Sequence, residues 1–257
     1  MLTAIAFDLW ETLITDTPEL HGRQERLRLE RMERILRETG YAGTAEQIDK
    51  AYRRLWHRCH ELYWASDRDV SCRTQIDHFL EALELEISDE ATIDALEQAY
   101  ARAAVEVLPS TVDGAAEVLA EVKRRGFRVG LISNTGRTPG YALREILDRL
   151  GLARFIDIMV FSNEHGECKP RQSIFEALRK PLGVTFEEML FVGDNLYVDV
   201  HGAQQCGMRS VHFMPDRRGD AVAPPVDHGH RIEPDATIKH LRDLPGLIDA
   251  LRGVETS

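Results

Sequence analysis

The sequence predicts an α/β protein built on a doubly wound parallel sheet, with a helical unit inserted after the first strand. From Pro109 onward, short apolar runs alternate with amphipathic stretches, which is typical of strands joined by helical crossovers. Between residues 16 and 108, apolar residues instead recur at helical spacing, and Pro18 is the only proline. We therefore expect a sheet domain made of residues 1–15 and 109–257, and a helical domain made of residues 16–108.

Each element of the sheet domain is expected from its local pattern. Asp113 is a candidate N-cap, and Gly126 a stop, for a helix over 115–125. The polar stretch 216–227, rich in Gly and Pro, is expected to be a loop. The predicted strands are 3–7, 127–132, 156–161, 189–192 and 209–213, and the predicted helices are 115–125, 141–150, 173–179, 200–205 and a last helix broken by Pro245.

Within the helical insert, apolar positions such as Leu29, Met32 and Leu36 share one helical face. Possible breaks between its helices are Gly40, Gly43 and the polar stretch 66–69.

The composition narrows the class of function. The chain has 257 residues, 43% of them hydrophobic, and a net charge of −11, which argues against a nucleic-acid surface. It has no apolar stretch near the ~20 residues that a membrane span needs. The four cysteines (Cys59, Cys72, Cys168 and Cys206) lack CxxC spacing, so we expect reduced thiols, no zinc site and a cytoplasmic protein. A small-molecule substrate and a monomer or homodimer are expected.

Reactive side chains follow four of the predicted strands. Asp8, Ser133, Lys169 and Asp194 each come after a short apolar run, and Asp199 lies five residues beyond Asp194. Because the carboxyl ends of parallel strands meet at one edge of the sheet, we expect these groups to converge on one crevice.

These residue types suit phosphoryl transfer. Asp8 can act as a nucleophile, since carboxylates form covalent intermediates such as aspartyl phosphates. Together with Asp194 and Asp199 it makes an all-oxygen site suited to Mg²⁺.

Three further groups would complete the site. Lys169 would offset the negative charge and hold a phosphate, Ser133 would supply a hydroxyl, and the Asn134 amide would point a donor at the same oxygens. Each residue alone has an ordinary explanation as part of a turn or a helix cap. Their occurrence in this order after successive strands favours the interpretation that they form a functional site.

In this order the motifs resemble those of the haloacid dehalogenase superfamily. Asp8-Leu9-Trp10-Glu11-Thr12-Leu13 is similar to its first motif, Asp-x-Asp-Gly-Thr, and the other three motifs are matched by Ser133, by Lys169-Pro170 and by Gly193-Asp194-Asn195 with Asp199. The resemblance implies a Rossmann-like core, a helical C1-type cap over residues 16–108, and a Mg²⁺-dependent hydrolase, phosphatase-like, that acts through an aspartyl phosphate on Asp8.

The resemblance also implies roles for individual residues. It makes Asp8, Thr12, Ser133 and Lys169 catalytic, Asn134, Trp10 and Glu11 substrate-binding, and Asp8, the Trp10 backbone carbonyl, Asp194 and Asp199 the metal ligands.

One position departs from the family pattern. Trp10 stands where family phosphatases have the second aspartate, the general acid that protonates the leaving oxygen, a role typically worth ~10²–10⁴-fold. Glu11, where the family usually has Gly, could replace that acid, although a solvated loop residue is the favoured interpretation. The hydrolysis rate of substrates with good leaving groups, such as aryl phosphates, should fall least as a result of this replacement.

Three alternatives remain open. The first is a 2-haloacid dehalogenase, because those relatives carry an aromatic residue, usually Tyr followed by Gly, where Trp10-Glu11 sits. However, Asp194 beside Asp8 would repel a carboxylate substrate unless a cation is bound. The phosphonate-cleaving branch would need a cap lysine, and Lys50 is the only one. A non-catalytic binding or regulatory member is the third alternative.

Other cap residues are weaker candidates. His57 and His60 are expected on a packing face, although they could approach the site. The arginines from Arg23 to Arg37 are expected on a solvated helix face, with Arg23 or Arg26 as a candidate for an anionic substrate group.

Overall fold

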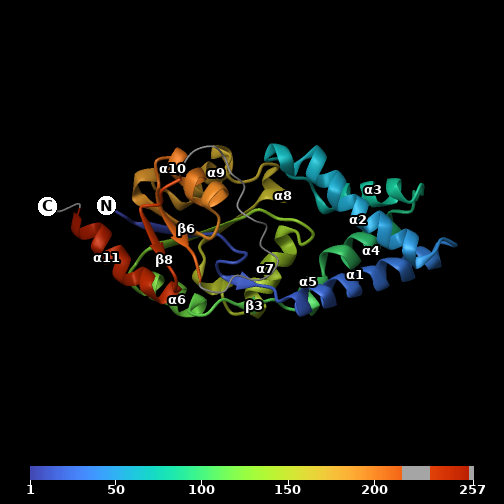
Figure 1. The fold of residues 1–257 in the computed structure, drawn as a ribbon, viewed down its shortest axis with the longest axis horizontal. Coiled ribbons are helices and arrows are strands. Elements are labelled where there is room, and N and C mark those ends of the chain that lie inside the picture. Colours follow the sequence, from blue (N-terminus) through green and yellow to red (C-terminus); the bar gives the residue numbers. More distant parts are fainter. Residues whose placement is uncertain (216–231, 255–257) are drawn as a thin grey trace.

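The computed structural model describes residues 1–215 and 232–254, so the predicted loop 216–227 lies outside the described residues. The molecule is elongated in Figure 1, with the sheet and its covering helices at one end and α1–α4 at the other. No helix within the described ranges is long and apolar enough to cross a bilayer.

A six-stranded parallel sheet forms the larger part. Its strand order is β5-β4-β1-β6-β7-β8, so β1 is central and pairs with both β4 and β6. A short antiparallel ribbon joins β2 to β3. This arrangement confirms the predicted doubly wound α/β class. The strands are β1 (Ala4–Phe7), β2 (Ile14–Thr15), β3 (Ser110–Thr111), β4 (Arg128–Ser133), β5 (Ile158–Phe161), β6 (Met189–Gly193), β7 (Arg209–Phe213) and β8 (Ala236–Ile238).

Helices cover both faces of this sheet. Alternate residues of β1 point to opposite sides, so Ile5 packs in one cluster with Leu119 and Ile146, while Ala6 packs in another with Phe175. Both clusters are buried, which makes the sheet the middle of three layers. The helices here are α5 (Ala103–Glu106), α6 (Ala115–Arg124), α7 (Gly140–Arg149), α8 (Ser162–His165), α9 (Gln172–Leu182), α10 (Gly202–Gln205) and α11 (Leu244–Val254).

Short helical turns complete the connections. They are η1 (Trp64–Ser66), η2 (Ala153–Phe155), η3 (Phe186–Glu188), the π-type turn η4 (Leu196–His201) and η5 (Leu241–Asp243).

The helical unit has its own core. Met32, Tyr52, Phe79 and Leu96 are buried together in a cluster separate from those of the sheet. Its helices are α1 (Pro18–Glu38), α2 (Ala45–Leu62), α3 (Cys72–Ala82) and α4 (Glu90–Ala101), as Figure 1 shows. The domain boundaries at 15/16 and 108/109 stay a prediction.

Local sequence signals start the first two of these helices. The Thr17 hydroxyl accepts from Leu20 N, with Pro18 at the start of α1, where a missing N–H costs nothing. Thr44 and Gln47 form a reciprocal capping box at the start of α2.

Two details of the sequence prediction are wrong. Asp113 does not cap α6; Gly114, at φ 82°, is the cap residue, and the Asp113 carboxylate pairs with Arg242 instead. Pro245 does not break the last helix, because it lies in the first turn of α11, where no backbone N–H donor is needed.

Candidate active site

A cavity of ≈ 400 Å³ opens at the carboxyl edge of the sheet. The end of β1, the loops after β4 and β6, Lys169 and the helices α1 and α2 all contribute to its wall, so both parts of the molecule enclose it. The cavity is lined by Asp8, Trp10, Glu11, Asp16, His21, Gln24, Arg28, Trp56, Asn134, Thr135, Gly136, Arg137, Thr138, Lys169, Asp194, Asn195, Val198 and Asp199.

Asp8 is held in place by groups around the end of β1. Its backbone N–H donates to Val192 O at 2.9 Å, and its Oδ2 accepts from the Thr12 hydroxyl at 3.1 Å. Burial raises the pKa of Asp8 to about 6, Lys169 acts to lower it, and Asp199 adds to the rise. A nucleophile in this position therefore depends on nearby positive charge to stay ionised.

Lys169 supplies part of that charge from a side chain that is only 1% exposed. Its Nζ donates to Asp8 Oδ1 at 2.6 Å, to Asp199 Oδ1 at 2.7 Å and to Ile132 O at 3.1 Å. Burial disfavours the charged form, but Asp199 and Asp8 outweigh this effect and hold the pKa of Lys169 above its usual value. Lys169 thus remains an ammonium between two carboxylates.

Three carboxylates meet at this point. Asp8, Asp194 and Asp199 each offer an oxygen within 4.8 Å of the others. Asp199 Oδ2 accepts from Asn195 N at 3.0 Å, and a Cβ at Gly193 would lie 2.4 Å from the Asp199 carboxylate, so only glycine fits there. The oxygen donors and their surplus of negative charge fit Mg²⁺.

Two predicted donors are placed differently from the expectation. Asn134 lines the cavity, but one N–H of its Nδ2 donates to Lys169 O at 3.0 Å, and its Oδ1 accepts from Lys169 N at 2.8 Å. It therefore positions the lysine main chain. The Ser133 hydroxyl is 1% exposed and donates to Asn134 O at 3.2 Å.

Glu11 occupies a strained backbone position. Its φ is 59°, a left-handed conformation that favours glycine, and this explains why glycine is usual at this place in the family. Its carboxylate lines the cavity and accepts from the Thr15 hydroxyl at 2.9 Å. Trp10, beside it, also lines the cavity.

Sequence reasoning missed most of the wall formed by the helical unit. Gln24 and Arg28 are buried at i,i+4 spacing on α1, in line with Met32 and Leu36. This stripe changes from apolar to polar toward the start of the helix, which is the signal that could have identified the two residues. Gln24 Nε2 donates to Asp16 Oδ1 at 3.0 Å.

The cap candidates named from the sequence lie elsewhere. Arg23 and Arg26 are exposed and do not line the cavity. The arginine of α1 that lines it is Arg28. His57 and His60 are exposed rather than packed, because they lie on the outer face of α2. Lys50 is exposed as well and pairs with Glu46 at 2.7 Å.

Asp69, which the sequence gave no reason to single out, ties the helical unit to the sheet domain. Its buried carboxylate accepts from Trp64 Nε1 and from the Thr135 hydroxyl, both at 2.8 Å, and from the Ser162 hydroxyl at 2.5 Å. A single carboxylate thus fixes the loop after β4 against η1.

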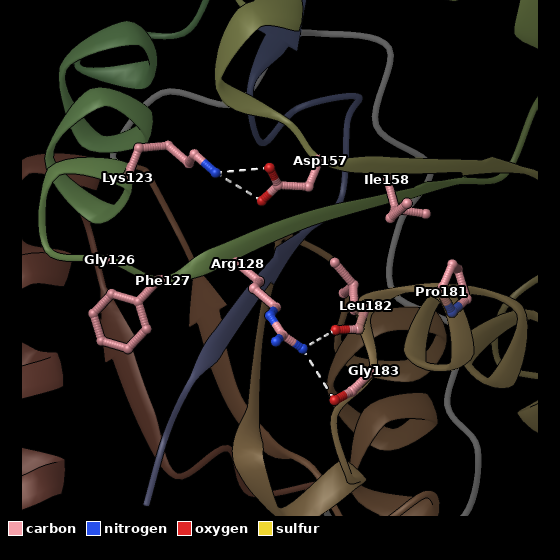
Figure 2. Close-up of a pocket in the computed structure, with 9 residues that line it drawn as sticks. All are labelled: Lys123, Gly126, Phe127, Arg128, Asp157, Ile158, Pro181, Leu182 and Gly183. Atoms are coloured by element: carbon pink, nitrogen blue, oxygen red, sulfur yellow. Dashed lines mark hydrogen bonds and ion pairs between the residues drawn. The ribbon is translucent and has the colours of Figure 1, made fainter.

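A second hollow, of ≈ 600 Å³, lies at the amino end of β4, away from these groups (Figure 2). Its charged side chains already have partners: Lys123 Nζ lies 2.7 Å from Asp157 Oδ1, and Arg128 donates to the carbonyls of Leu182 and Gly183. We therefore assign no chemistry to it.

The fold and the site together define a hydrolase-type α/β core with a buried aspartate, a paired lysine and an acidic cluster beneath helices. The haloacid dehalogenase-like hydrolase family matches residues 2–207, and the chain belongs to this family. The resemblance seen in the motifs is thereby confirmed.

Curated relatives match over most of their length. The chain is 30% identical to a ribulose-1,5-bisphosphate 5-phosphatase of Halopiger xanaduensis, over 96% of this chain and 100% of that protein. It is also 30% identical to a glyceraldehyde 3-phosphate phosphatase of Pyrococcus abyssi, over 83% of this chain and 82% of the relative.

Solved structures share the fold. A 2-haloacid dehalogenase from Pseudomonas syringae superposes with a TM-score of 0.65 at 21% identity, covering 98% of this chain and 100% of that one. A phosphatase from Thermococcus onnurineus gives a TM-score of 0.60 at 20% identity, over 96% and 98% of the two chains.

Proposed function

We propose that this protein is a phosphatase that hydrolyses phosphoric monoesters of small metabolites through Asp8. The observation that carries the proposal is the contact of Lys169 with both Asp8 and Asp199 beside a third carboxylate, Asp194. The relatives named as phosphatases over nearly the whole chain support it. The ≈ 400 Å³ cavity suits a small molecule.

The reaction would run in two displacements. An oxygen of Asp8 attacks phosphorus, the bond from phosphorus to the ester oxygen breaks, and the alcohol leaves with a proton. Water then attacks phosphorus of the aspartyl phosphate, the bond to the Asp8 oxygen breaks, and inorganic phosphate leaves.

The residues around Asp8 would position it and balance charge. Lys169 would hold the carboxylate and then the transferring phosphoryl oxygens, while Asn134 fixes the Lys169 main chain. Thr12 would orient Asp8 through its hydrogen bond to Oδ2, and Ser133 remains a candidate donor whose hydroxyl would have to turn toward the substrate. Positioning and charge neutralisation are the main requirements of this chemistry.

Mg²⁺ is the proposed cofactor. Asp8, Asp194, Asp199 and the backbone carbonyl of Trp10 would hold it, and when bound it would neutralise negative charge on the phosphoryl group. The donor set supports this assignment, since three carboxylates with oxygens within 4.8 Å suit a hard cation.

The source of the proton for the leaving group is the open part of the mechanism. Trp10 cannot supply it. Among the carboxyls that line the cavity, Glu11 is the candidate proposed from the sequence, and its carboxylate accepts a hydrogen bond from the Thr15 hydroxyl.

Phosphate release from an aryl phosphate tests the proposal, because an aryl leaving group needs little protonation. We expect release with Mg²⁺, none with a chelator, and none from Asp8→Asn. As a readout besides activity, Mg²⁺ should raise the melting temperature of the wild type, and Asp194→Asn should remove that rise. Absence of release under every condition would overturn the proposal.

Dehalogenation is the second candidate. The aromatic Trp10 in the cavity wall favours it, whereas Asp194 beside Asp8 opposes it by repelling a carboxylate substrate. Halide release from 2-haloacids without added metal would decide for it. A protein active in neither assay would be a binding member of the family. Cytoplasmic location and a monomeric or homodimeric state remain predictions.

A further inference from the structure

Two arginines line the cavity without a carboxylate partner. Arg28 comes from α1 and Arg137 from the loop after β4. Throughout residues 1–215 and 232–254, neither forms an ion pair. The burial of Arg28 beside the cavity carries a cost in desolvation, which a bound anion would offset.

Arg28 is held rigidly and is only 2% exposed. Its Nε donates to Tyr100 O at 2.8 Å, and its Nη2 donates to the Thr138 hydroxyl at 3.2 Å. The other terminal nitrogen, Nη1, has no hydrogen-bond partner in the described part of the chain, although the side chain lines the cavity. The N–H groups of Nη1 are therefore available to an acceptor bound in the cavity.

Arg137 is positioned by aromatic rings instead of hydrogen bonds. Its guanidinium lies 4.2 Å from the ring centroid of Trp56 and 4.8 Å from that of Tyr52. The rings fix the plane of the guanidinium, and its N–H donors make no hydrogen bond to the described residues. The planar fork is thus available for two-pronged contact with a carboxylate or phosphate.

The titratable groups near the two arginines do not neutralise their positive charge. Burial and then the charge of Arg137 lower the pKa of His21, which disfavours a charged imidazole beside the arginines. Asp16 is the carboxyl whose pKa Arg28 acts to lower, but burial raises that pKa to about 6, and its Oδ1 accepts from Gln24. Glu11, the other carboxylate near this wall, accepts from Thr15.

The arginines are distinct from the phosphoryl site. Arg28 contacts Tyr100 and Thr138, and Arg137 packs on the α2 rings of Tyr52 and Trp56. The contacts of Asp8 are instead with Thr12 and Lys169 at the end of β1. Because all three residues line one cavity, a substrate with its phosphoryl group at Asp8 could place a second group at the arginines.

We propose that Arg28 and Arg137 form an anion subsite, so that the substrate is a phosphomonoester carrying a second anionic group, a carboxylate or a phosphate. The proposal rests on the proposed function, because it takes Asp8 as the place of the reacting phosphoryl group. It extends that function by defining the substrate class.

Binding to Asp8→Asn protein with Mg²⁺, measured by isothermal titration calorimetry, tests the subsite without turnover. Two matched pairs of probes separate the two anions. The affinity of 3-phosphoglycerate relative to that of glycerol 3-phosphate measures the contribution of the carboxylate. The affinity of ribulose 1,5-bisphosphate relative to that of ribulose 5-phosphate measures the contribution of the second phosphate. We expect the doubly anionic member of at least one pair to bind tenfold tighter or more.

Arg137→Gln, added to this background, should reduce the ratio of affinities to near one, and Arg137→Lys should restore part of it. Arg23→Gln is the matched control, because Arg23 lies on α1 outside the cavity, and it should keep the full ratio. Melting temperatures check that each variant is folded.

Equal affinity within both pairs, or a ratio that survives Arg137→Gln, would overturn the subsite. So would absence of binding by all four probes. A failed aryl phosphatase assay would instead overturn the proposed function, and the affinity ratio would still be measured independently.

Discussion

The Nζ atom of Lys169 lies 2.6 Å from Oδ1 of Asp8, and both side chains are buried. The two residues are 161 positions apart in sequence. They meet because Asp8 follows the central strand β1 and the Lys169 loop follows β5, which is separated from β1 by β4 alone. The contact sets the charge state of the proposed nucleophile, since burial alone favours the neutral acid. Removal of the lysine should therefore affect chemistry and stability together.

Lys169→Met is expected to lower the rate of aryl phosphate hydrolysis by at least ~100-fold, because the carboxylates and the transferring group lose their fixed cation. It should also cost about 3–5 kcal/mol of unfolding free energy, since Asp8 and Asp199 are left without their buried partner. Steady-state kinetics and urea unfolding measure the two effects. Lys180→Met, at an exposed lysine, is the control. Activity within tenfold of the wild type would contradict the assigned role.

Glu11 is expected to be replaceable without loss of the fold. Its φ of 59° is one that glycine adopts freely, so Glu11→Gly should not disturb the turn that leads from Trp10 to Ile14. If the carboxyl of Glu11 donates the proton to the leaving group, Glu11→Gln and Glu11→Gly should both slow alkyl phosphates by ~10²-fold or more and leave aryl phosphates nearly unaffected.

The measurement is kcat/KM for one alkyl and one aryl phosphate in each variant. Thr15→Val is a useful companion, because it removes the hydroxyl that holds Glu11 while keeping the carboxyl group. Equal slowing of both leaving-group classes would exclude Glu11 as the acid.

Asp69 is expected to control how firmly the helical unit is held to the sheet domain. Asp69→Ala leaves Trp64, Thr135 and Ser162 without their common acceptor, which should lower the unfolding free energy by about 2–4 kcal/mol. Asp69→Asn keeps one acceptor oxygen and should cost less. Urea unfolding followed by tryptophan fluorescence compares them, with Asp94→Ala at an exposed site as control. A loss below 1 kcal/mol in Asp69→Ala would argue against the role.

The parallel sheet and the edge at which Asp8 and Lys169 meet could be predicted from the sequence for a physical reason. Apolar runs buried on both faces define the strands of a parallel sheet, and the residues that follow them must lie at one edge, as Asp8 and Lys169 do. The ribbon β2–β3 and the short edge strand β8 were missed, because two or three residues carry no periodic pattern.

The wall formed by the helical unit could not be predicted in the same way. Which face of α1 meets the cavity depends on how the helices dock, so Arg23 and Arg26 were as plausible as Arg28. The same limit applied to Asn134, whose amide could equally have faced a substrate or, as it does, the Lys169 main chain. Hydrogen bonds across such distances depend on tertiary geometry.

Asp16 should make stability depend on pH. Burial raises its pKa from 3.8 to about 6, although Gln24 and Arg28 act to lower it. The folded protein therefore holds a proton that the unfolded chain has released between these two values, and stability should fall as pH rises from 4 to 6 and stay lower above. Since one pKa unit is worth about 1.4 kcal/mol, the loss should be on the order of 1–3 kcal/mol.

Asp16→Asn cannot ionise and keeps an acceptor for Gln24. Its unfolding free energy should therefore equal that of the wild type near pH 4 and exceed it at pH 7 by about 1–3 kcal/mol. Urea unfolding at several pH values measures the difference, and Asp148→Asn, at an exposed aspartate, controls for the loss of one negative charge. The direction is set by burial, because the desolvation cost of an ionised Asp16 exceeds what Gln24 and Arg28 contribute in the opposite sense. A difference between Asp16→Asn and wild type that stays constant from pH 4 to pH 8 would mean that Asp16 is ionised normally in the folded protein.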